Sequence, residues 1–293
     1  MIVTIHNDQL TLTADTLGAQ MQSITSYKGT EYLWNGDERY WKGRAPVLFP
    51  FVARLKDKTY TVNGGTYQMK IHGFASACEF EVAEQTESSV TFALRDNEVT
   101  RAQYPFAFLF KVRYALKEST VEVTYTVDNP ENEMLHFGLG GHPGFNVPLK
   151  EGTSFEDYYL RFSQPCEPDR VGFSSEILVS GVDKRYELED GQIIRLRHDL
   201  FDHDAIVLKN MAKSVTIASD KTKRYVTVSY PQMPYVGFWH AERKAAPYVC
   251  VEPWVSLPAR DGVIEDFACK GDLIHLPGHG SYENTWYITI GEE

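Results

Sequence analysis

Residues 58–70 read Lys-Thr-Tyr-Thr-Val-Asn-Gly-Gly-Thr-Tyr-Gln-Met-Lys, and this stretch decides the fold class. Polar and apolar residues alternate around a central Asn63-Gly64 pair, and a period of two is typical of a β-strand with one buried face. Asn-Gly supplies the positive φ values that the type I′ turn of a two-residue hairpin requires. The stretch therefore predicts an antiparallel hairpin.

The same period of two recurs along the chain, and turn residues follow about every ten positions, as in sandwiches and barrels. Strand-like runs lie at 1–6, 9–13, 21–27, 80–83, 89–95, 106–116, 120–128, 157–162, 192–196, 205–208, 214–219, 225–230, 248–252 and 281–290. Only short helices are predicted, at 37–43 and 198–201. Strands do not alternate with helices, which argues against a parallel α/β sheet. We predict an all-β fold, a large antiparallel β-sandwich with few short helices, and a single domain over residues 1–293.

Composition excludes several classes of function. The chain has 293 residues, 43% of them hydrophobic, and 40 acidic against 29 basic residues give a net charge of −11. This acidic balance argues against a nucleic-acid binder, which needs clustered Lys and Arg. No apolar run approaches the roughly 18 residues of a membrane span, and the first residues read as a strand. The four cysteines are far apart with no CxxC pair, which favours reduced thiols. We predict a cytoplasmic protein without nucleic-acid or membrane partners.

Residues 139–146, Leu-Gly-Gly-His-Pro-Gly-Phe-Asn, hold His142 among three glycines. Glycine costs backbone entropy and adds no packing. Three glycines around one imidazole indicate that the backbone either comes close to another group or turns sharply there. The structural alternative is a tight turn in which His142 caps a carbonyl.

Two further charged residues stand in apolar surroundings. Arg54 ends the apolar run 45–53, and a buried guanidinium needs a partner, which could simply be Asp57. Glu252 follows Tyr-Val-Cys-Val and precedes Pro253-Trp254. Desolvation raises the pKa of a carboxylic acid, and groups perturbed in this way gather at functional sites. Glu252 is therefore a candidate functional acid.

His72 follows the hairpin and Asp204 precedes a strand; the structural alternatives are a histidine bonded to a carbonyl and a turn acid. With Arg54, His142 and Glu252 they fit an uncharged, hydroxyl-rich ligand, which needs planar hydrogen-bonding groups and aromatic faces. The candidate faces are Trp34, Tyr40, Trp41, Trp239 and Trp254. A carboxylate and an imidazole also supply a base and an acid that titrate near neutrality.

Four segments, taken in order, carry a resemblance to a known family. They are Phe-Pro-Phe-Val-Ala-Arg-Leu-Lys-Asp at 49–57, Ile-His-Gly-Phe at 71–74, Gly-Gly-His-Pro-Gly-Phe at 140–145 and Cys-Val-Glu-Pro-Trp at 250–254. The combination resembles the aldose 1-epimerases, or mutarotases, and most of all the bacterial branch named for the X protein of the lactose operon. Segments 266–270 and 276–278 are also similar to that branch.

The resemblance implies a single-domain β-supersandwich with an open cleft across one sheet. It implies that Glu252 is the general base and His142 the general acid. Arg54, His72 and Asp204 would bind sugar hydroxyls, with Asp202 as the alternative to Asp204. Glu252→Gln and His142→Asn variants are then predicted to fold and to lose most activity, and the rate is predicted to have one pH limb from each group.

One position departs from the family pattern. Gly237 stands where better-studied galactose mutarotases have a sugar-binding glutamine. Trp239 or His240 could compensate, and we count Trp239 among the substrate-binding residues. The departure argues against galactose as the preferred sugar.

We predict an isomerase that interconverts the α and β anomers of a free hexose by acid–base-catalysed ring opening and closure, without a metal or other cofactor. A small-molecule sugar is the predicted partner, and a homodimer stays open beside a monomer. The alternatives are a non-catalytic sugar-binding sandwich and a glycoside hydrolase using Glu252 with Asp204 or Asp202. A metal enzyme would be built on His72, His142 and His240. A hexose-6-phosphate mutarotase would bind phosphate through Arg44 and Arg54.

Overall fold

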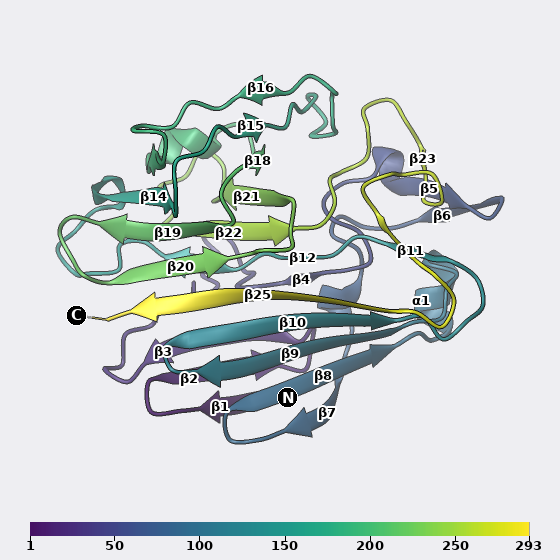
Figure 1. Cartoon of the computed structure of the whole chain (residues 1–293), viewed down its shortest axis with the longest axis horizontal. Helices are drawn as coiled ribbons and strands as arrows, with labels where there is room; N and C mark the ends of the chain where they lie inside the picture. Colours follow the sequence, from purple (N-terminus) through teal and green to yellow (C-terminus); the bar gives the residue numbers. More distant parts are fainter. Residues whose placement is uncertain (293) are drawn as a thin grey trace.

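A computed structural model describes residues 1–292 and consists mainly of antiparallel β-sheets (Figure 1). The larger of the two main sheets runs from β17 at one edge to β7 at the other. Within the described chain it has nine strands, in the spatial order β17 (Ile193–Arg195), β14 (Tyr158–Phe162), β19 (Ser214–Ser219), β20 (Tyr225–Ser229), β25 (Ser281–Gly291), β10 (Thr120–Asp128), β9 (Leu109–Lys117), β8 (Ser89–Arg95) and β7 (Glu81–Gln85).

The second large sheet carries the residues of the candidate site. Its strands within residues 1–292 follow the order β16 (Lys184–Arg185), β15 (Asp169–Arg170), β18 (Ile206–Lys209), β21 (Tyr235–Trp239), β22 (Tyr248–Trp254), β12 (Gly140–Gly141) and β4 (Val47–Leu48). Strand β13 (Gly144–Asn146) also pairs with β22. Strand β22 therefore has β21 on one side and both β12 and β13 on the other.

Smaller elements complete the chain. They are the sheet β1 (Ile2–His6), β2 (Leu10–Asp15) and β3 (Gln20–Ser26), the sheet β23 (Glu265–Asp266), β5 (Thr59–Val62) and β6 (Gly65–Gln68), and the pair β11 (Leu135–Phe137) and β24 (Ile274–Leu276). The helices are α1 (Glu98–Gln103) and the 3₁₀ turns η1 (Lys56–Lys58), η2 (Ala75–Ala77), η3 (Phe155–Asp157) and η4 (His198–Phe201). No helix in residues 1–292 is long and apolar enough to cross a membrane.

Strand alternation places the core between the two large sheets. In β10 every second residue is buried, from Val121 to Val127. These side chains belong to the same hydrophobic cluster as Phe238 of β21 and Val251 of β22. Burying one face of each sheet against the other is the architecture of a sandwich. The predicted antiparallel β-sandwich is confirmed.

The predicted hairpin is also confirmed. Strands β5 and β6 pair antiparallel, with Val62 opposite Gly65. The two loop residues, Asn63 and Gly64, have φ values of 51° and 75°. Both are positive, as a type I′ turn requires.

The helix predictions are half right. The segment 198–201 forms η4, but 37–43 forms no helix. The segment makes a single turn, in which the Asp37 carbonyl oxygen accepts from the N–H groups of Tyr40 and Trp41. The Trp41 carbonyl accepts from the Trp34 indole. Helix α1 was not predicted. Its signal is the capping box of Asn97 and Thr100, and six residues are too few for a periodic pattern.

The glycines around His142 serve close packing. A Cβ on Gly140 would lie 2.7 Å from Cδ1 of Trp254, and one on Gly141 would lie 2.6 Å from Cζ2 of Trp286. Neither glycine has a positive φ. Of the two readings of this stretch, close approach is therefore confirmed, and the neighbouring groups are indole rings.

Candidate active site

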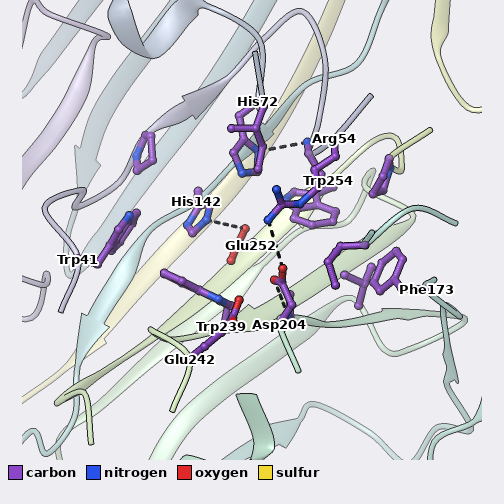
Figure 2. A pocket seen from close by; sticks show the side chains of 17 residues that line it. Trp41, Arg54, His72, His142, Phe173, Asp204, Trp239, Glu242, Glu252 and Trp254 are labelled. Atoms are coloured by element: carbon purple, nitrogen blue, oxygen red, sulfur yellow. Dashed lines mark hydrogen bonds and ion pairs between the residues drawn. The ribbon is translucent and has the colours of Figure 1, made fainter. Parts of the chain in front are cut away.

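His142 and Glu252 meet on the open face of the second sheet. His142 lies between β12 and β13, and its backbone N–H donates to the carbonyl of Pro46 at 3.1 Å. Glu252 lies within β22, a strand buried along its whole length, opposite Gly237 of β21. The Nε2 atom of His142 is 3.2 Å from Oε2 of Glu252, and the two side chains are 10% and 2% exposed. Figure 2 shows the two side chains pointing toward each other.

Burial drives both groups toward their neutral forms. Desolvation raises the pKa of Glu252 well above its ordinary value, Asp204 adds to the rise, and the Trp254 indole opposes it. Desolvation also lowers the pKa of His142 well below its ordinary value, and His72 adds to this effect. The pair is therefore stable as carboxylic acid and neutral imidazole. Transfer of the carboxyl proton of Glu252 to His142 would convert this neutral pair into a carboxylate and an imidazolium, with the same total number of protons.

Each member of the pair has one buried polar atom without a hydrogen-bond partner. Within residues 1–292, neither Oε2 of Glu252 nor Nδ1 of His142 has a hydrogen-bond partner, and both are buried. The contact at 3.2 Å lacks hydrogen-bond geometry. Buried polar atoms normally have partners, and unpaired ones are typical of functional sites.

His72 faces the same cavity in a fixed orientation. Its backbone N–H donates to the carbonyl of Ala53 at 3.0 Å, and the Ala53 N–H donates to its Nδ1 at 3.1 Å. The second bond requires an unprotonated Nδ1, so the ring proton sits on Nε2. Burial, and then Arg54, lower the pKa of His72 to about 4. His72 is thus a neutral hydrogen-bond donor at neutral pH.

Arg54 and Asp204 form an ion pair beside His142 and Glu252. Nη2 of Arg54 is 3.5 Å from Oδ2 of Asp204, whose Oδ1 accepts from the Ala205 N–H at 2.7 Å. Arg54 thus pairs with a carboxylate, as its structural alternative expected, but that carboxylate is Asp204 and not Asp57, which pairs with Lys56. Asp204 lines the cavity that contains His142 and Glu252, whereas Asp202 lines only an adjoining hollow.

Aromatic rings close the cavity. Trp41 stacks on His142 with ring centres 4.9 Å apart, and Trp239 meets both rings edge-on, at 5.5 Å from Trp41 and 5.7 Å from His142. Trp254 also lines the cavity. The other two candidate rings, Trp34 and Tyr40, do not line the cavity. Trp34 is 3% exposed and stacks on Tyr248.

The cavity itself has a volume of about 370 Å³. It brings together all six residues that the sequence analysis assigned to the site: Arg54, His72, His142, Asp204, Trp239 and Glu252. Sequence reasoning missed Phe173, Ile177 and Glu242, which also line it. They come from irregular loops, where no periodic pattern marks a residue as facing a site.

Two of the alternatives that involve basic side chains do not match the structure. His240 is fully buried and turned away from the cavity, with Nδ1 on the Ala241 carbonyl and Nε2 on His198. It therefore neither replaces the missing glutamine nor joins a histidine metal site. The Trp254 ring fills the space instead, because its Cζ2 lies 3.3 Å from a Cβ built on Gly237. Arg44 donates to the carbonyl of Gln22 and does not join Arg54 in a phosphate site.

One other group of potential metal ligands exists within residues 1–292. Ligand atoms of His142, Cys250 and Glu252 lie within 4.8 Å of one another. Burial and Glu252 raise the pKa of the Cys250 thiol well above its ordinary value. A thiol must be deprotonated to bind a metal, so the protonated Cys250 is better described as packing beneath the acid–base pair.

Comparison with known proteins agrees with this arrangement. Residues 1–259 match the family described as aldose 1-epimerase. The chain belongs to the aldose 1-epimerase family. It is 34% identical over 266 residues to the chromosomal and plasmid LacX proteins of Lactococcus lactis subsp. lactis, which covers 88% of each chain. The resemblance drawn from the four sequence segments is confirmed.

Solved structures of the family share the fold. A galactose mutarotase related enzyme from Lactobacillus acidophilus superposes with a TM-score of 0.95 at 34% identity, over 100% of this chain and 98% of that one. A galactose mutarotase-like protein from Lactobacillus casei gives a TM-score of 0.92 at 31% identity, over 99% and 100%. As a member of the aldose 1-epimerase family, the protein is an isomerase that acts on carbohydrates.

Proposed function

We propose that the protein interconverts the α and β anomers of a free hexose, with Glu252 as general base and His142 as general acid. The observation that carries the proposal is the contact of a buried carboxyl group and a buried imidazole, 3.2 Å apart, at a cavity sized for one sugar. The resident pair holds the one proton that the reaction needs. No cofactor enters the proposal.

The proposed reaction moves two protons. Glu252 takes the proton from the C1 hydroxyl while His142 gives a proton to the ring oxygen, the C1–O5 bond breaks, and the aldehyde forms. Rotation about C1–C2 exposes the other carbonyl face. Attack by the O5 hydroxyl on that face returns one proton to His142, and Glu252 returns its proton to the new C1 hydroxyl. Positioned acids and bases typically contribute about 10²–10⁴-fold each.

The remaining residues are assigned to binding. The Nε2–H of His72 and the guanidinium of Arg54 donate to sugar hydroxyls, and Asp204 accepts from them. Trp239 offers an apolar ring face to the C–H surface of the sugar. Because Asp204 already pairs with Arg54, the two residues keep each other oriented before the sugar arrives, which lowers the entropic cost of binding.

Polarimetry on freshly dissolved α-glucose and α-galactose tests the proposal. Acceleration of the approach to anomeric equilibrium, proportional to protein concentration, is the expected result. A sugar-binding module without catalysis would bind the sugars and leave the rate unchanged. A glycoside hydrolase would instead release nitrophenol from a nitrophenyl glycoside.

Replacing His72 with alanine is expected to raise KM about two- to tenfold, because one hydrogen bond to the sugar, worth about 0.5–1.5 kcal/mol, is lost. The increase in KM should be the same throughout pH 6 to 8, because the pKa of His72 is about 4 and its ring stays neutral in that range. Saturation kinetics at three pH values measure both effects. A fall in kcat at unchanged KM would contradict the binding role.

Replacing Trp41 with leucine is expected to move the acidic limb of the rate to higher pH and to lower kcat about tenfold. Trp41 covers one face of the His142 ring, so its loss lets water solvate the imidazolium and raises the pKa of His142 toward its ordinary value. The titratable groups around His142, which are His72, Cys250 and Glu252, stay in place in this variant. Trp41→Phe, which keeps a stacked ring, is the control. An unshifted limb in Trp41→Leu would contradict this role.

A further inference from the structure

Two histidines meet on the short sheet of β11 and β24. His136 of β11 lies directly opposite His275 of β24, and the Nδ1 atoms of the two rings are 2.6 Å apart. Neither ring lines the cavity that contains His142 and Glu252. Directly opposite residues of an antiparallel pair project from the same face of the sheet. Strand pairing therefore brings the two imidazoles together at a place remote from the proposed chemistry.

The contact between the two rings has room for one proton. A neutral imidazole carries a proton on one nitrogen and a lone pair on the other, so one Nδ1 donates to the other across the 2.6 Å. Each ring can instead carry its proton on Nε2 and offer the Nδ1 lone pair to a metal ion. Imidazole is the commonest metal ligand in proteins and suits zinc, copper and nickel. A divalent transition metal can thus replace the shared proton.

The separation of the two nitrogens is close to the one that a metal ion requires. Zinc–nitrogen bonds are about 2.0–2.1 Å long, and two of them at a tetrahedral angle span roughly 3.3 Å. The Nδ1 atoms, now 2.6 Å apart, must therefore separate by roughly 0.7 Å. His275 is exposed, so its ring can move by this amount through rotation about its side-chain bonds.

His136, in contrast, is held by its surroundings. Its side chain is buried, and its backbone carbonyl accepts from the Tyr104 hydroxyl at 2.8 Å. The ring of Phe106 meets the His136 ring edge-on, with ring centres 5.9 Å apart. A ligand whose position is already set by packing loses little freedom when a metal binds. The pair therefore combines one fixed ligand with one that can adjust.

The charges around the pair also suit a cation. Burial and then His275 lower the pKa of His136, and the Asp266 carboxylate opposes this fall. A lowered pKa keeps the imidazole neutral, with a lone pair available to a metal. Within residues 1–292, the titratable groups that perturb His136 are His275 and Asp266. The negative charge of Asp266 stabilises a positive ion at His136.

We propose that His136 and His275 bind a divalent transition metal of the zinc and copper class, with their Nδ1 atoms as the protein ligands and water in the remaining positions. The ion would join β11 to β24 and would take no part in the reaction, because the pair lies outside the cavity of His142 and Glu252. Magnesium and calcium prefer oxygen ligands and are not expected to bind here.

Zinc titration of the full chain tests the inference. Isothermal titration with ZnCl₂ near neutral pH is expected to show a site that MgCl₂ does not fill. His275→Ala is expected to weaken zinc binding at this site at least about tenfold, because one of the two protein ligands is lost. His6→Ala, which removes an exposed histidine of β1, is the matched control and should bind zinc as the unaltered protein does. No zinc binding, or equal binding in the unaltered protein and His275→Ala, would overturn the inference.

Thermal melts and copper spectra supply independent readouts. The Tm of the unaltered protein is expected to rise with zinc concentration, because an ion that binds only the folded chain stabilises it. This rise should be lost in His275→Ala and kept in His6→Ala. The electron paramagnetic resonance spectrum of bound Cu²⁺ should show coupling to two imidazole nitrogens in the unaltered protein and to one in His275→Ala. A copper spectrum that is identical in these two proteins would contradict the assignment of the ligands.

Discussion

A Glu252→Gln variant is expected to lose about 10²–10⁴-fold in kcat, the contribution of one general base. Glutamine has the shape of the protonated carboxyl group but cannot accept the proton of the C1 hydroxyl. KM is expected to change little, because the binding groups Arg54, His72 and Asp204 are untouched. Polarimetry on the purified variant measures the loss, and a rate within threefold of the unaltered protein would contradict the assignment.

The same substitution is expected to stabilise the fold at neutral and alkaline pH. Burial raises the pKa of Glu252 above its value of 4.5 in the unfolded chain. Above that value the unfolded chain releases the proton while the folded chain retains it, so stability falls as pH rises toward the folded pKa. Glutamine has no proton to release. Thermal melts should therefore give Glu252→Gln a higher Tm than the unaltered protein at pH 8, and a difference close to zero at pH 4.

These two readouts separate catalysis from folding. A variant that is inactive because it is misfolded would lose both activity and Tm. A general base held protonated by its surroundings gives the opposite combination, with activity lost and stability gained. Such a combination is expected where the burial of a functional group lowers the stability of the fold.

Strands with one buried face were predicted from sequence with accurate bounds. Strand β10 alternates buried and part-buried positions, and its predicted bounds, 120–128, match the structure. Strand β21 was missed because Gly237 interrupts its pattern and Pro234 stands directly before it. The strand forms through pairing with β18 and β22 on its two sides. Local sequence records burial on one face well, and it records pairing with distant strands poorly.

The residues of the candidate site also differ in how well the sequence predicts them. Glu252 and His142 stood out because a titratable group within an apolar or glycine-rich run requires a physical reason. Trp41 was assigned to a sugar face, although it stacks on His142, and the helix predicted around it is a single turn. Its position follows from contacts with residues a hundred positions away, and no pattern in residues 37–43 encodes these. The catalytic and binding roles themselves stay predictions.

A His142→Asn variant is expected to lose about 10²–10⁴-fold in kcat, because the ring oxygen must then leave without a proton from a positioned acid. Asparagine keeps a polar side chain of similar breadth between the glycines but does not titrate. Polarimetry between pH 5 and 9 measures both the loss and its pH dependence, and near-normal activity would refute the role of His142.

The pH dependence of the residual activity distinguishes the two variants. In the unaltered protein the active pair holds one proton, so activity falls at low pH, where His142 also becomes protonated, and at high pH, where Glu252 loses its proton. Burial lowers the pKa of His142 and raises that of Glu252, so the plateau between the limbs is broad. In His142→Asn the remaining base must be ionised, and the residual rate should rise with pH through the raised pKa of Glu252. In Glu252→Gln the remaining acid must be protonated, and the residual rate should fall as pH rises through the lowered pKa of His142. Residual rates that vary with pH in the same direction in both variants would show that these two groups do not divide the work of acid and base.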